Sequence, residues 1–281
     1  MSTYMTPGGA GANMSIKEYS RKIEPALYNA MQFIPLIKER AEKIMDGLYV
    51  RRLGRVATQT MSTTNDGTTV TFSDLAPTAF QLSPAWVLAA AAYPDSAPRR
   101  HGDEIDPAYA ANLTAALAAG LDTLVLAEIQ AGTTTPIGDG STSIDAAKLR
   151  AALTALETNS KRLVKAGLSE LNVLLDTGQV GASLAIPEIN NAYQRGDGKS
   201  PTVSGRISTG LGFKFDYTTL LASDGNGKHG AAFHGDAIHY GYNQRPKAEK
   251  QRYLKQTRLM SDAEIGFETI YQELLQPIRT A

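Results

Sequence analysis

The chain has 281 residues, 42% of them hydrophobic, which is enough apolar material for one large domain or two smaller ones. It contains no cysteine, which excludes a disulfide framework, a thiolate nucleophile and metal sites ligated by cysteine. The start lacks a signal-peptide pattern, and we expect no apolar run to approach the roughly 20 residues of a membrane span. These features predict a soluble protein made in a reducing cytoplasm.

The net charge of zero conceals a segregation of charge along the chain. Residues 1–55 carry nine Lys/Arg and five Asp/Glu, residues 56–147 carry two and ten, and residues 245–258 carry six and one. One interpretation is that the middle of one copy meets the ends of another, because complementary patches steer self-association. The alternative is solvated surface charge with ordinary pairing inside the chain.

The N-terminal quarter has the pattern of an arm. Residues 1–14 are aperiodic and are predicted to form a tail. Residues 15–47 are helical in pattern but are broken by Pro25 and Pro35, which predicts two or three short helices. Residues 48–56 hold three arginines with no acid among them: Arg51, Arg52 and Arg55. The stretch has too little apolar surface to fold alone.

Residues 56–83 are rich in threonine and predict a long two-stranded hairpin. Runs of β type flank the Asn-Asp-Gly sequence at 65–67, and Asn and Gly tolerate the positive φ of tight hairpin turns. Because the hairpin has few large apolar residues, we expect it to lie across another surface rather than in a core. Residues 85–93 (AWVLAAAAY) follow as a buried strand or short helix, and residues 94–105 as a polar loop.

The clearest pattern is a helix from Asp106 to Ala131. Asp106 can cap its start, Pro107 suits the first helical position, and Gly132 marks its end. The predicted apolar stripe consists of Leu113, Leu117, Leu121, Leu124 and Val125, while Asn112, Thr114, Asp122 and Glu128 are assigned elsewhere on the helical wheel. At 1.5 Å per residue the helix would be roughly 35–40 Å long, so we expect it to be the spine of the molecule.

The second half alternates helices, strands and loops. We predict a helix over residues 145–166, a short buried strand over 171–176, and a helix over 181–196 that Pro187 interrupts. A period of two over residues 205–217 predicts one strand, with these apolar residues on one side: Ile207, Leu211, Phe213, Phe215 and Tyr217. Residues 231–243 fit a strand or a helix equally well.

No constellation for catalysis or metal binding stands out. The three clustered histidines, His229, His234 and His239, are five residues apart, and neither a strand nor a helix puts all three on one face at that spacing. The GNGKHG sequence at 225–230 lacks the Ser/Thr that a phosphate-binding loop needs after its Lys, and GDGST at 138–142 is typical of turns. The basic stretches can neutralise phosphate, but no aromatic platform accompanies them that would bind single strands.

The order of elements resembles the major capsid protein of tailed bacteriophages, which has the Hong Kong 97-type fold. The resemblance is carried by the basic arm, the Thr-rich hairpin, the spine helix with its exit at 117–133, and the stretches 203–221 and 231–244. It implies an α+β capsid fold in four parts. These would be an N-terminal arm (1–55), an extended β-hairpin loop (56–83), a peripheral domain with the spine helix (84–144 and 248–281), and an axial domain (145–247).

The resemblance also implies a function without catalytic residues, cofactors or metals. The chain would be a major capsid protein of the virion that self-assembles into pentamers and hexamers, forming an icosahedral shell around double-stranded DNA. Implied partners are other copies of the chain, a separate scaffolding protein, a portal, packaged DNA bound non-specifically and a decoration protein, with no membrane. If the extended loop crosses a neighbour, the candidate subunit-interface residues are Arg51, Arg52, Arg55, Asp66 and Asp74.

Two features depart from parts of that family, and two alternatives stay open. No lysine lies between Lys43 and Lys148, which excludes the Lys–Asn isopeptide bond that some members form from the extended loop. The short start leaves no room for a cleavable scaffolding segment, so we expect either a separate scaffolding protein, which the start at Met1 favours, or a chain numbered from its mature end. One alternative is an encapsulin-like cellular compartment with the same fold. The other is a soluble α+β enzyme or ligand-binding protein with its site in the Gly-rich loops 132–142 and 224–230.

Overall fold

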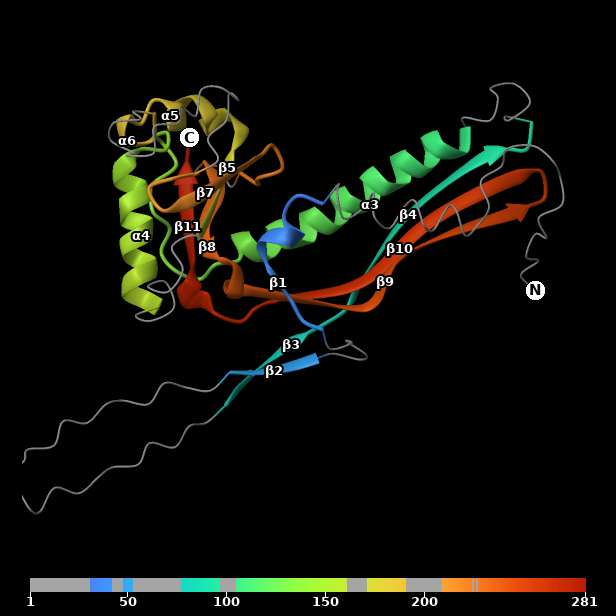
Figure 1. Ribbon diagram of the computed structural model, residues 1–281, viewed down its shortest axis with the longest axis horizontal. Coiled ribbons are helices and arrows are strands. Elements are labelled where there is room, and N and C mark those ends of the chain that lie inside the picture. The colour runs from blue at the N-terminus through green and yellow to red at the C-terminus, as the bar shows by residue number, and fades with distance from the viewer. Residues whose placement is uncertain are drawn as a thin grey trace, which may run out of the picture.

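Two β-sheets and a projecting ribbon are arranged around a long helix in the computed structural model (Figure 1). The structure describes residues 31–41, 48–52, 77–96, 105–160, 171–190, 209–223, 225 and 227–281. In spatial order, the four-stranded sheet contains β1 (Lys38–Glu39), β9 (Ile238–Tyr253), β10 (Gln256–Thr269) and β4 (Ala85–Pro94). The five-stranded sheet contains β11 (Leu275–Thr280), β8 (Lys228–His234), β5 (Leu171–Asp176), β7 (Phe213–Thr218) and β6 (Thr209–Gly210).

The helices, the 3₁₀ turns and the ribbon complete the described elements. The α-helices are α3 (Ile105–Gln130), α4 (Ala146–Ser160), α5 (Val180–Leu184) and α6 (Pro187–Asn190). The 3₁₀ turns are η1 (Ile34–Leu36), η4 (Thr177–Gln179), η6 (Gly235–Ala237) and η7 (Gln272–Leu274). The ribbon consists of β2 (Leu48–Arg52) and β3 (Thr78–Leu82), which pair antiparallel. The arrangement is the mixed α+β architecture that the sequence predicted.

The spine helix α3 begins and ends within one residue of its predicted bounds, and it lies along one face of the four-stranded sheet (Figure 1). Val87 of β4 packs against Gly120, where an added Cβ would lie only 3.0 Å from the valine. By length and composition residues 108–130 could cross a membrane, which corrects the expectation that no apolar run is that long. Half of this stretch is buried inside the protein, as in a core helix.

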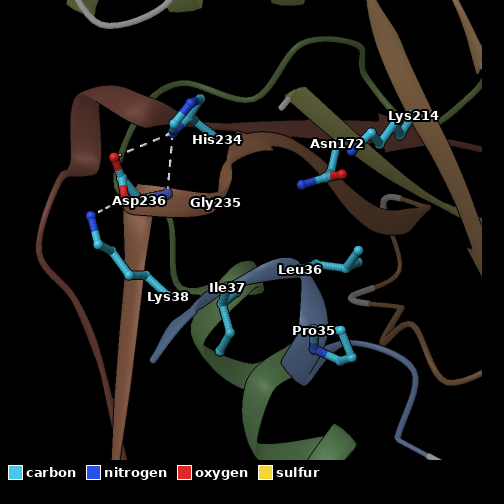
Figure 2. Close-up of a pocket in the computed structure, with 9 residues that line it drawn as sticks. All are labelled: Pro35, Leu36, Ile37, Lys38, Asn172, Lys214, His234, Gly235 and Asp236. Atoms are coloured by element: carbon cyan, nitrogen blue, oxygen red, sulfur yellow. Dashed lines mark hydrogen bonds and ion pairs between the residues drawn. The ribbon is translucent and has the colours of Figure 1, made fainter. Parts of the chain in front are cut away.

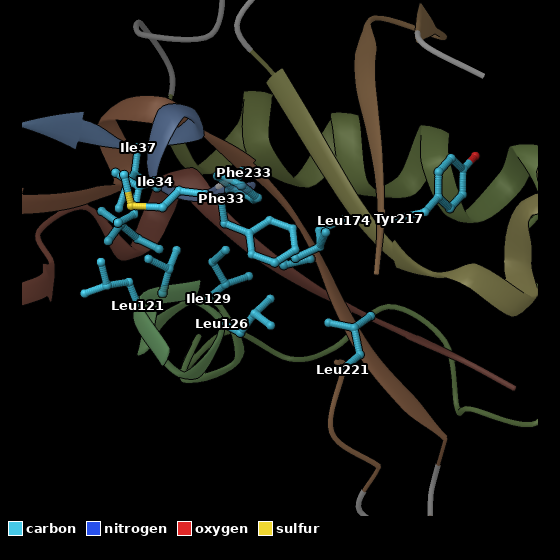
Figure 3. Close-up of a cluster of buried hydrophobic side chains, with 14 of the residues drawn as sticks. Phe33, Ile34, Ile37, Leu121, Leu126, Ile129, Leu174, Tyr217, Leu221 and Phe233 are labelled. Atoms are coloured by element: carbon cyan, nitrogen blue, oxygen red, sulfur yellow. The ribbon is translucent and has the colours of Figure 1, made fainter. Parts of the chain in front are cut away.

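The buried side of α3 differs from the predicted stripe at Leu124, which is only partly buried, and at two polar positions. Leu113, Leu117, Leu121 and Val125 are buried as expected, together with Leu126 and Ile129. Figure 3 shows Leu121, Leu126 and Ile129 in this cluster. Thr114 and Asp122 were assigned away from this stripe and are nevertheless buried, with exposed fractions of 4% and 5%. Thr114 donates its hydroxyl hydrogen to the carbonyl of Ala110. Asp122 is buried because it accepts hydrogen bonds from a segment about 90 residues earlier in the chain.

That earlier segment, residues 31–37, packs between the spine and the five-stranded sheet. The backbone N–H groups of Gln32 and Phe33 donate to the Asp122 carboxylate at 3.0 and 3.1 Å. Phe33 and Ile34 insert into the main hydrophobic core, next to Leu121 and Phe233 (Figure 3). Pro35, predicted as a helix breaker, lies in η1. The Asp122 carboxylate therefore provides hydrogen-bond acceptors for two backbone N–H groups that are shielded from water.

The strand β4 corrects the prediction that residues 85–93 are buried. Its exposure alternates: Ala89 and Tyr93 are buried on the α3 side, and Trp86 and Leu88 are 71% and 58% exposed on the other side. The alternation arises because successive side chains of β4 point to opposite faces of the sheet and only one of those faces meets the helix α3. The apolar composition of this strand therefore does not reflect burial.

The five-stranded sheet confirms the short buried strand β5. The interruption of the helix predicted over 181–196 is also confirmed, because α5 ends at Leu184 and α6 begins at Pro187; residues 191–196 lie outside the described residues. The predicted single strand over 205–217 is wrong, because Leu211 and Gly212 have φ angles of 51° and 85° and turn the chain between β6 and β7. Phe213, Phe215 and Tyr217 are buried as the period of two predicted. The unassigned residues 231–243 belong to β8, η6 and β9. The part of the second predicted helix beyond residue 160 lies outside the described residues.

The β2–β3 ribbon begins earlier in the chain than the predicted hairpin. Arg51 and Arg52 belong to β2, so this part of the predicted arm is instead a strand paired with the end of the extended loop. In every pair, from Leu48 with Leu82 to Arg52 with Thr78, the two residue numbers add up to 130, so the register is centred on position 65. The sequence predicted its hairpin turn at 65–67, which lies outside the described residues.

The four-part division of the chain stays a prediction. Its boundary between 247 and 248 falls inside β9, which pairs along its length with β10. The last strand, β11, was assigned with the peripheral domain but pairs with β8 in the five-stranded sheet. The C-terminal strand therefore ties the two sheets together.

Candidate assembly surfaces

The ribbon carries two of the predicted interface residues. Arg51 is exposed on β2, and Arg52 is the last residue of that strand. Arg55, Asp66 and Asp74 lie outside the described residues. The structure therefore places two of the predicted residues on one projecting element and leaves the association of the other three as a prediction.

One face of the ribbon is fixed to the body and the other is open. Val50 and Leu82 pack on Ile270, which follows β10, and all three are buried. On the opposite face Tyr49 is 62% exposed, and Ala79 and Gln81 are also exposed. A small apolar cluster thus orients a ribbon that otherwise extends away from the sheets (Figure 1).

Several charges that looked sorted along the sequence are paired or buried within the chain. Asp95, from the acidic region, binds Arg252 of the basic region with a separation of 2.6 Å. Asp122 binds backbone amides, and Glu128 accepts a hydrogen bond from Thr269. Burial is the main cause that raises the pKa of both Asp122 and Glu128. For these residues the alternative of ordinary intrachain pairing is the correct interpretation.

The short strand β1 is attached to β9 by a polar cluster. Lys38 binds Asp236 at 2.6 Å, and Arg245 binds Glu39 at 3.0 Å. Arg40 donates from Nε to Nδ1 of His239 at 3.0 Å. This hydrogen bond requires the neutral imidazole, because a protonated Nδ1 cannot accept.

The environment of His239 favours that neutral form. His239 is 1% exposed, and burial, followed by the positive charges of Arg40 and Lys38, lowers its pKa from 6.5 to about 4. The carboxylate of Asp236 opposes this shift. Sequence reasoning treated His239 only as a possible metal ligand, because its partners lie about 200 residues away.

The three histidines do not form a metal site. His229 and His234 lie on β8 and His239 lies on β9, and Nδ1 of His234 accepts a hydrogen bond from the backbone of Asp236. Within the described residues, no group of three or more His, Asp or Glu side chains is arranged to hold a metal ion.

A cavity of about 270 Å³ lies beside β1 (Figure 2). It is lined by Pro35, Leu36, Ile37, Lys38, Asn172, Lys214, His234, Gly235 and Asp236. The acid and base in it already serve the structure, since Asp236 pairs with Lys38 and His234 accepts from a backbone N–H. The lining contains no Ser, Thr or Cys that a neighbouring base could activate as a nucleophile.

The Gly-rich loops 132–142 and 224–230 do meet, but their backbones fill the space between them. An added Cβ on Gly227 would lie 2.7 Å from Cα of Gly140 and would also overlap the carbonyl oxygen of Thr280. Gly227 has a φ of 106°, which favours glycine. Of the described glycines in these loops, Gly132, Gly138 and Gly227 pack closely against β11, Gly230 packs against β5, and Gly225 is surrounded by open space.

The surface that sequence reasoning missed is the outer side of β4. Trp86 donates from Nε1 to Oδ2 of Asp262 at 3.1 Å, and that carboxylate also accepts from Gln244 at 2.7 Å. The indole is thus fixed in place while its ring stays exposed. The signal that would have found it is the alternation of Trp86 and Leu88 with smaller residues, which is typical of a strand with one free face.

Solved structures of two phage capsids and of a virus-like particle have a fold similar to that of this chain. The chain is similar in structure to the capsid of cyanophage Pam1, with a TM-score of 0.68 and 10% identity over 99% of this chain and 97% of that one. It is also similar to the mature capsid of bacteriophage PhiM1, with a TM-score of 0.65 and 11% identity over 100% and 92%. A virus-like particle from Pyrococcus furiosus gives a TM-score of 0.59 and 12% identity over 93% and 100%.

At these identities the structural matches establish the fold, which is the Hong Kong 97-type capsid fold of the resemblance. No curated protein sequence matches the chain. The family model described as phage capsid protein matches residues 55–261, which is well over half of the sequence and runs from the ribbon through the spine helix into β10. The chain therefore belongs to the phage capsid protein family and is a structural component of a virion capsid.

Proposed function

We propose that the chain is a major capsid subunit that assembles into pentamers and hexamers and forms an icosahedral shell around double-stranded DNA. Assembly needs no catalytic residue, because each copy contributes surfaces that are buried only on its neighbours. A separate scaffolding protein, a portal and a decoration protein are further proposed partners, and packaged DNA is bound without sequence readout.

The observation that carries this proposal is the projecting β2–β3 ribbon. A two-stranded ribbon is marginally stable alone, because it cannot bury a core of its own. Here three buried residues, Val50, Leu82 and Ile270, fix its base, and Tyr49 and Arg51 remain exposed. Such an element gains stability when a neighbouring copy covers its open face. The extended loop 56–83 and the arm 1–55 are the proposed contacts with neighbours, with Arg51, Arg52, Arg55, Asp66 and Asp74 at the interface.

Charge reversal tests this interface. A variant with Arg51→Glu, Arg52→Glu and Arg55→Glu should fold normally by circular dichroism and should give at least tenfold fewer particles by electron microscopy. The matched control reverses the same number of exposed basic residues away from the ribbon, for example Arg150, Lys214 and Lys255. Normal shells from the ribbon variant would remove these arginines from the interface.

The runner-up, an enzyme or ligand-binding protein, is less well supported. Its proposed loops pack on each other through Gly227 and Gly140, and the cavity beside β1 holds acid and base groups that already pair internally. An encapsulin-like compartment shares the fold, but the match of the family model over residues 55–261 favours the phage capsid.

A further inference from the structure

His239 lies where the short strand β1 and the base of the ribbon both meet the body of the subunit. On one side, its Nδ1 accepts from Nε of Arg40 at 3.0 Å, and the backbone N–H of Arg40 donates to the carbonyl of Tyr240 at 2.7 Å. On the other side, the ring of Tyr271 meets the imidazole edge-on, with 6.0 Å between the ring centroids. The imidazole thus joins two segments that are far apart in the sequence.

Tyr271 connects the imidazole to the ribbon. The backbone N–H groups of Ile270 and Tyr271 donate to the carbonyl of Ala237 at 2.9 and 3.1 Å, which attaches this segment to the chain just before His239. Because closely packed side chains do not move independently, a displacement of the imidazole is transmitted to the ribbon. The side chain of Tyr271 makes this link, since it packs against the three residues that fix the ribbon base, Val50, Leu82 and Ile270.

The site accommodates only the neutral imidazole. His239 is 1% exposed, and within the described residues its buried Nε2 has no hydrogen-bond partner. Since Nδ1 accepts from Arg40, the proton of the neutral ring is on Nε2, and Nδ1 is the only place for a second proton. A proton there would replace a hydrogen bond with two donors that face each other.

The surrounding charges also disfavour the protonated ring. Burial, followed by Arg40 and Lys38, lowers the pKa of the histidine to about 4. The carboxylate of Asp236 opposes this shift but is already paired with Lys38 (Figure 2). Glu268 is the register partner of the histidine on β10, and burial and the nearby Glu128 of α3 raise its pKa, so it loses its charge over the same acidic range. The imidazolium therefore has no unshared anion among these groups.

We propose that His239 is a pH-sensitive switch for the orientation of the β2–β3 ribbon. Uptake of a proton detaches β1 from β9 and loosens the apolar cluster at the ribbon base, so that the ribbon turns about its junction with β4. The segment before β1 stays in place, because Phe33 and Ile34 are held in the main core by apolar contacts that do not titrate. The switch acts within one subunit, and its effect on contacts with neighbours rests on the proposed function.

The expected size of the effect follows from linkage between proton uptake and detachment. Once β1 is detached, the imidazole is exposed and its pKa returns to 6.5, against about 4 in the attached state. The ratio of detached to attached subunits should therefore rise roughly 30-fold between pH 7.5 and pH 5. Hydrogen exchange on the unassembled subunit measures this ratio. After correction for the intrinsic rate, the protection of residues 38–40 should fall roughly 30-fold, and that of β5 should not change.

The orientation of the ribbon is measured separately with pairs of spin labels, because the chain has no cysteine of its own. Ala79→Cys in β3 and Ala127→Cys in α3 place labels at exposed positions. The distance between them should have one narrow distribution at pH 7.5 and a shifted, broader one at pH 5. The matched control pair, Ala127→Cys with Ala147→Cys, joins α3 to α4 and should give the same distance at both pH values.

Three variants separate the steps. His239→Asn keeps an acceptor for Arg40 but does not titrate, so both pH effects should disappear. Arg40→Gln keeps a donor and removes one cation, so both effects should shrink severalfold, and this variant provides the test if the Asn variant does not fold. Tyr271→Leu should still lose protection at residues 38–40, but the ribbon distance should no longer depend on pH.

Several results would overturn the proposal. These are unchanged protection of residues 38–40 at pH 5, a fixed ribbon distance while that protection is lost, and undiminished pH effects in both His239→Asn and Arg40→Gln. A change in the α3–α4 control distance at pH 5 would indicate general unfolding and would also overturn it. All measurements use unassembled subunits, so failure of the chain to form shells would refute the capsid function and leave the switch standing.

Discussion

The neutral state of His239 gives a pH dependence that can be worked out in advance. In the folded subunit burial, Arg40 and Lys38 hold its pKa at about 4, against 6.5 for an ordinary histidine. Between these values the unfolded chain binds a proton that the folded chain does not bind. The free energy of unfolding therefore falls as the pH drops from about 6.5 to about 4, and this contribution is fully lost below pH 4.

The size of this loss follows from the shift in pKa. At about 1.4 kcal/mol per unit, a shift of roughly 2.5 units amounts to about 3 kcal/mol. The other charged groups around the imidazole are Lys38 on β1, Arg40 directly after β1, Asp236 on η6, and Glu268, its register partner on β10. Protonation of His239 would place a third positive charge beside Lys38 and Arg40 and would abolish the hydrogen bond from Arg40. We therefore expect β1 to detach from β9 before the rest of the subunit unfolds.

His239→Asn isolates this effect, because the Asn side-chain oxygen can accept from Arg40 but does not titrate. Urea unfolding of the unassembled subunit, followed by circular dichroism between pH 7.5 and 4, should show a fall in stability about 3 kcal/mol larger for the unaltered chain than for the variant. The carboxylates are common to both proteins and cancel in the comparison. Identical pH profiles would refute the reasoning from His239.

Three further substitutions test the packing of the subunit. Asp122→Ala leaves the backbone N–H groups of Gln32 and Phe33 buried without an acceptor, so it should cost about 2–4 kcal/mol in urea unfolding and speed proteolysis near residue 31; Asp122→Asn should cost less. Gly227→Ala should destabilise by at least 2 kcal/mol more than Gly212→Ala, since both have positive φ but open space surrounds only Gly212; equal thermal shifts would contradict the close packing. Leu82→Ala loosens the base of the ribbon, so the particle yield should fall severalfold while the thermal midpoint of the subunit changes little. A lowered thermal midpoint with an unchanged particle yield would count against an assembly role.

Local signals in the sequence were sufficient for the spine helix. Pro107 and Gly132 mark its ends through backbone chemistry that depends on near neighbours, and the structure agrees within one residue. The same holds for the break at Pro187 and for the buried strand β5. The order of such elements was enough to identify the capsid fold.

Contacts between residues far apart in the sequence could not be predicted from these local signals. Asp122 was assigned to a polar side because its partners, Gln32 and Phe33, lie about 90 residues away. The strand β4 was expected to be buried because hydrophobic composition does not distinguish a core from an uncovered interface. Leu211 was read as part of a strand because its period of two continues through a turn that positive φ at Leu211 and Gly212 creates.

The candidate interface was only partly predictable. The sequence indicated the ribbon and its arginines, but charge sorting overstated the acidic surface, since Asp95 and Asp122 are used inside the chain. The exposed Trp86 needed the structure, because its exposure depends on which face of β4 the helix α3 covers. An apolar assembly surface and an apolar core have similar compositions, and they differ in whether the same chain or a neighbouring subunit covers them. The sequence of one chain does not distinguish these two cases.

Electron microscopy of the purified chain, produced alone and together with the scaffolding protein that we propose for it, tests the central claim most directly. The account predicts closed icosahedral shells of pentamers and hexamers in which the ribbon of each subunit lies on an adjacent copy. A uniform small oligomer under both conditions, or shells in which every ribbon folds back on its own subunit, would contradict it.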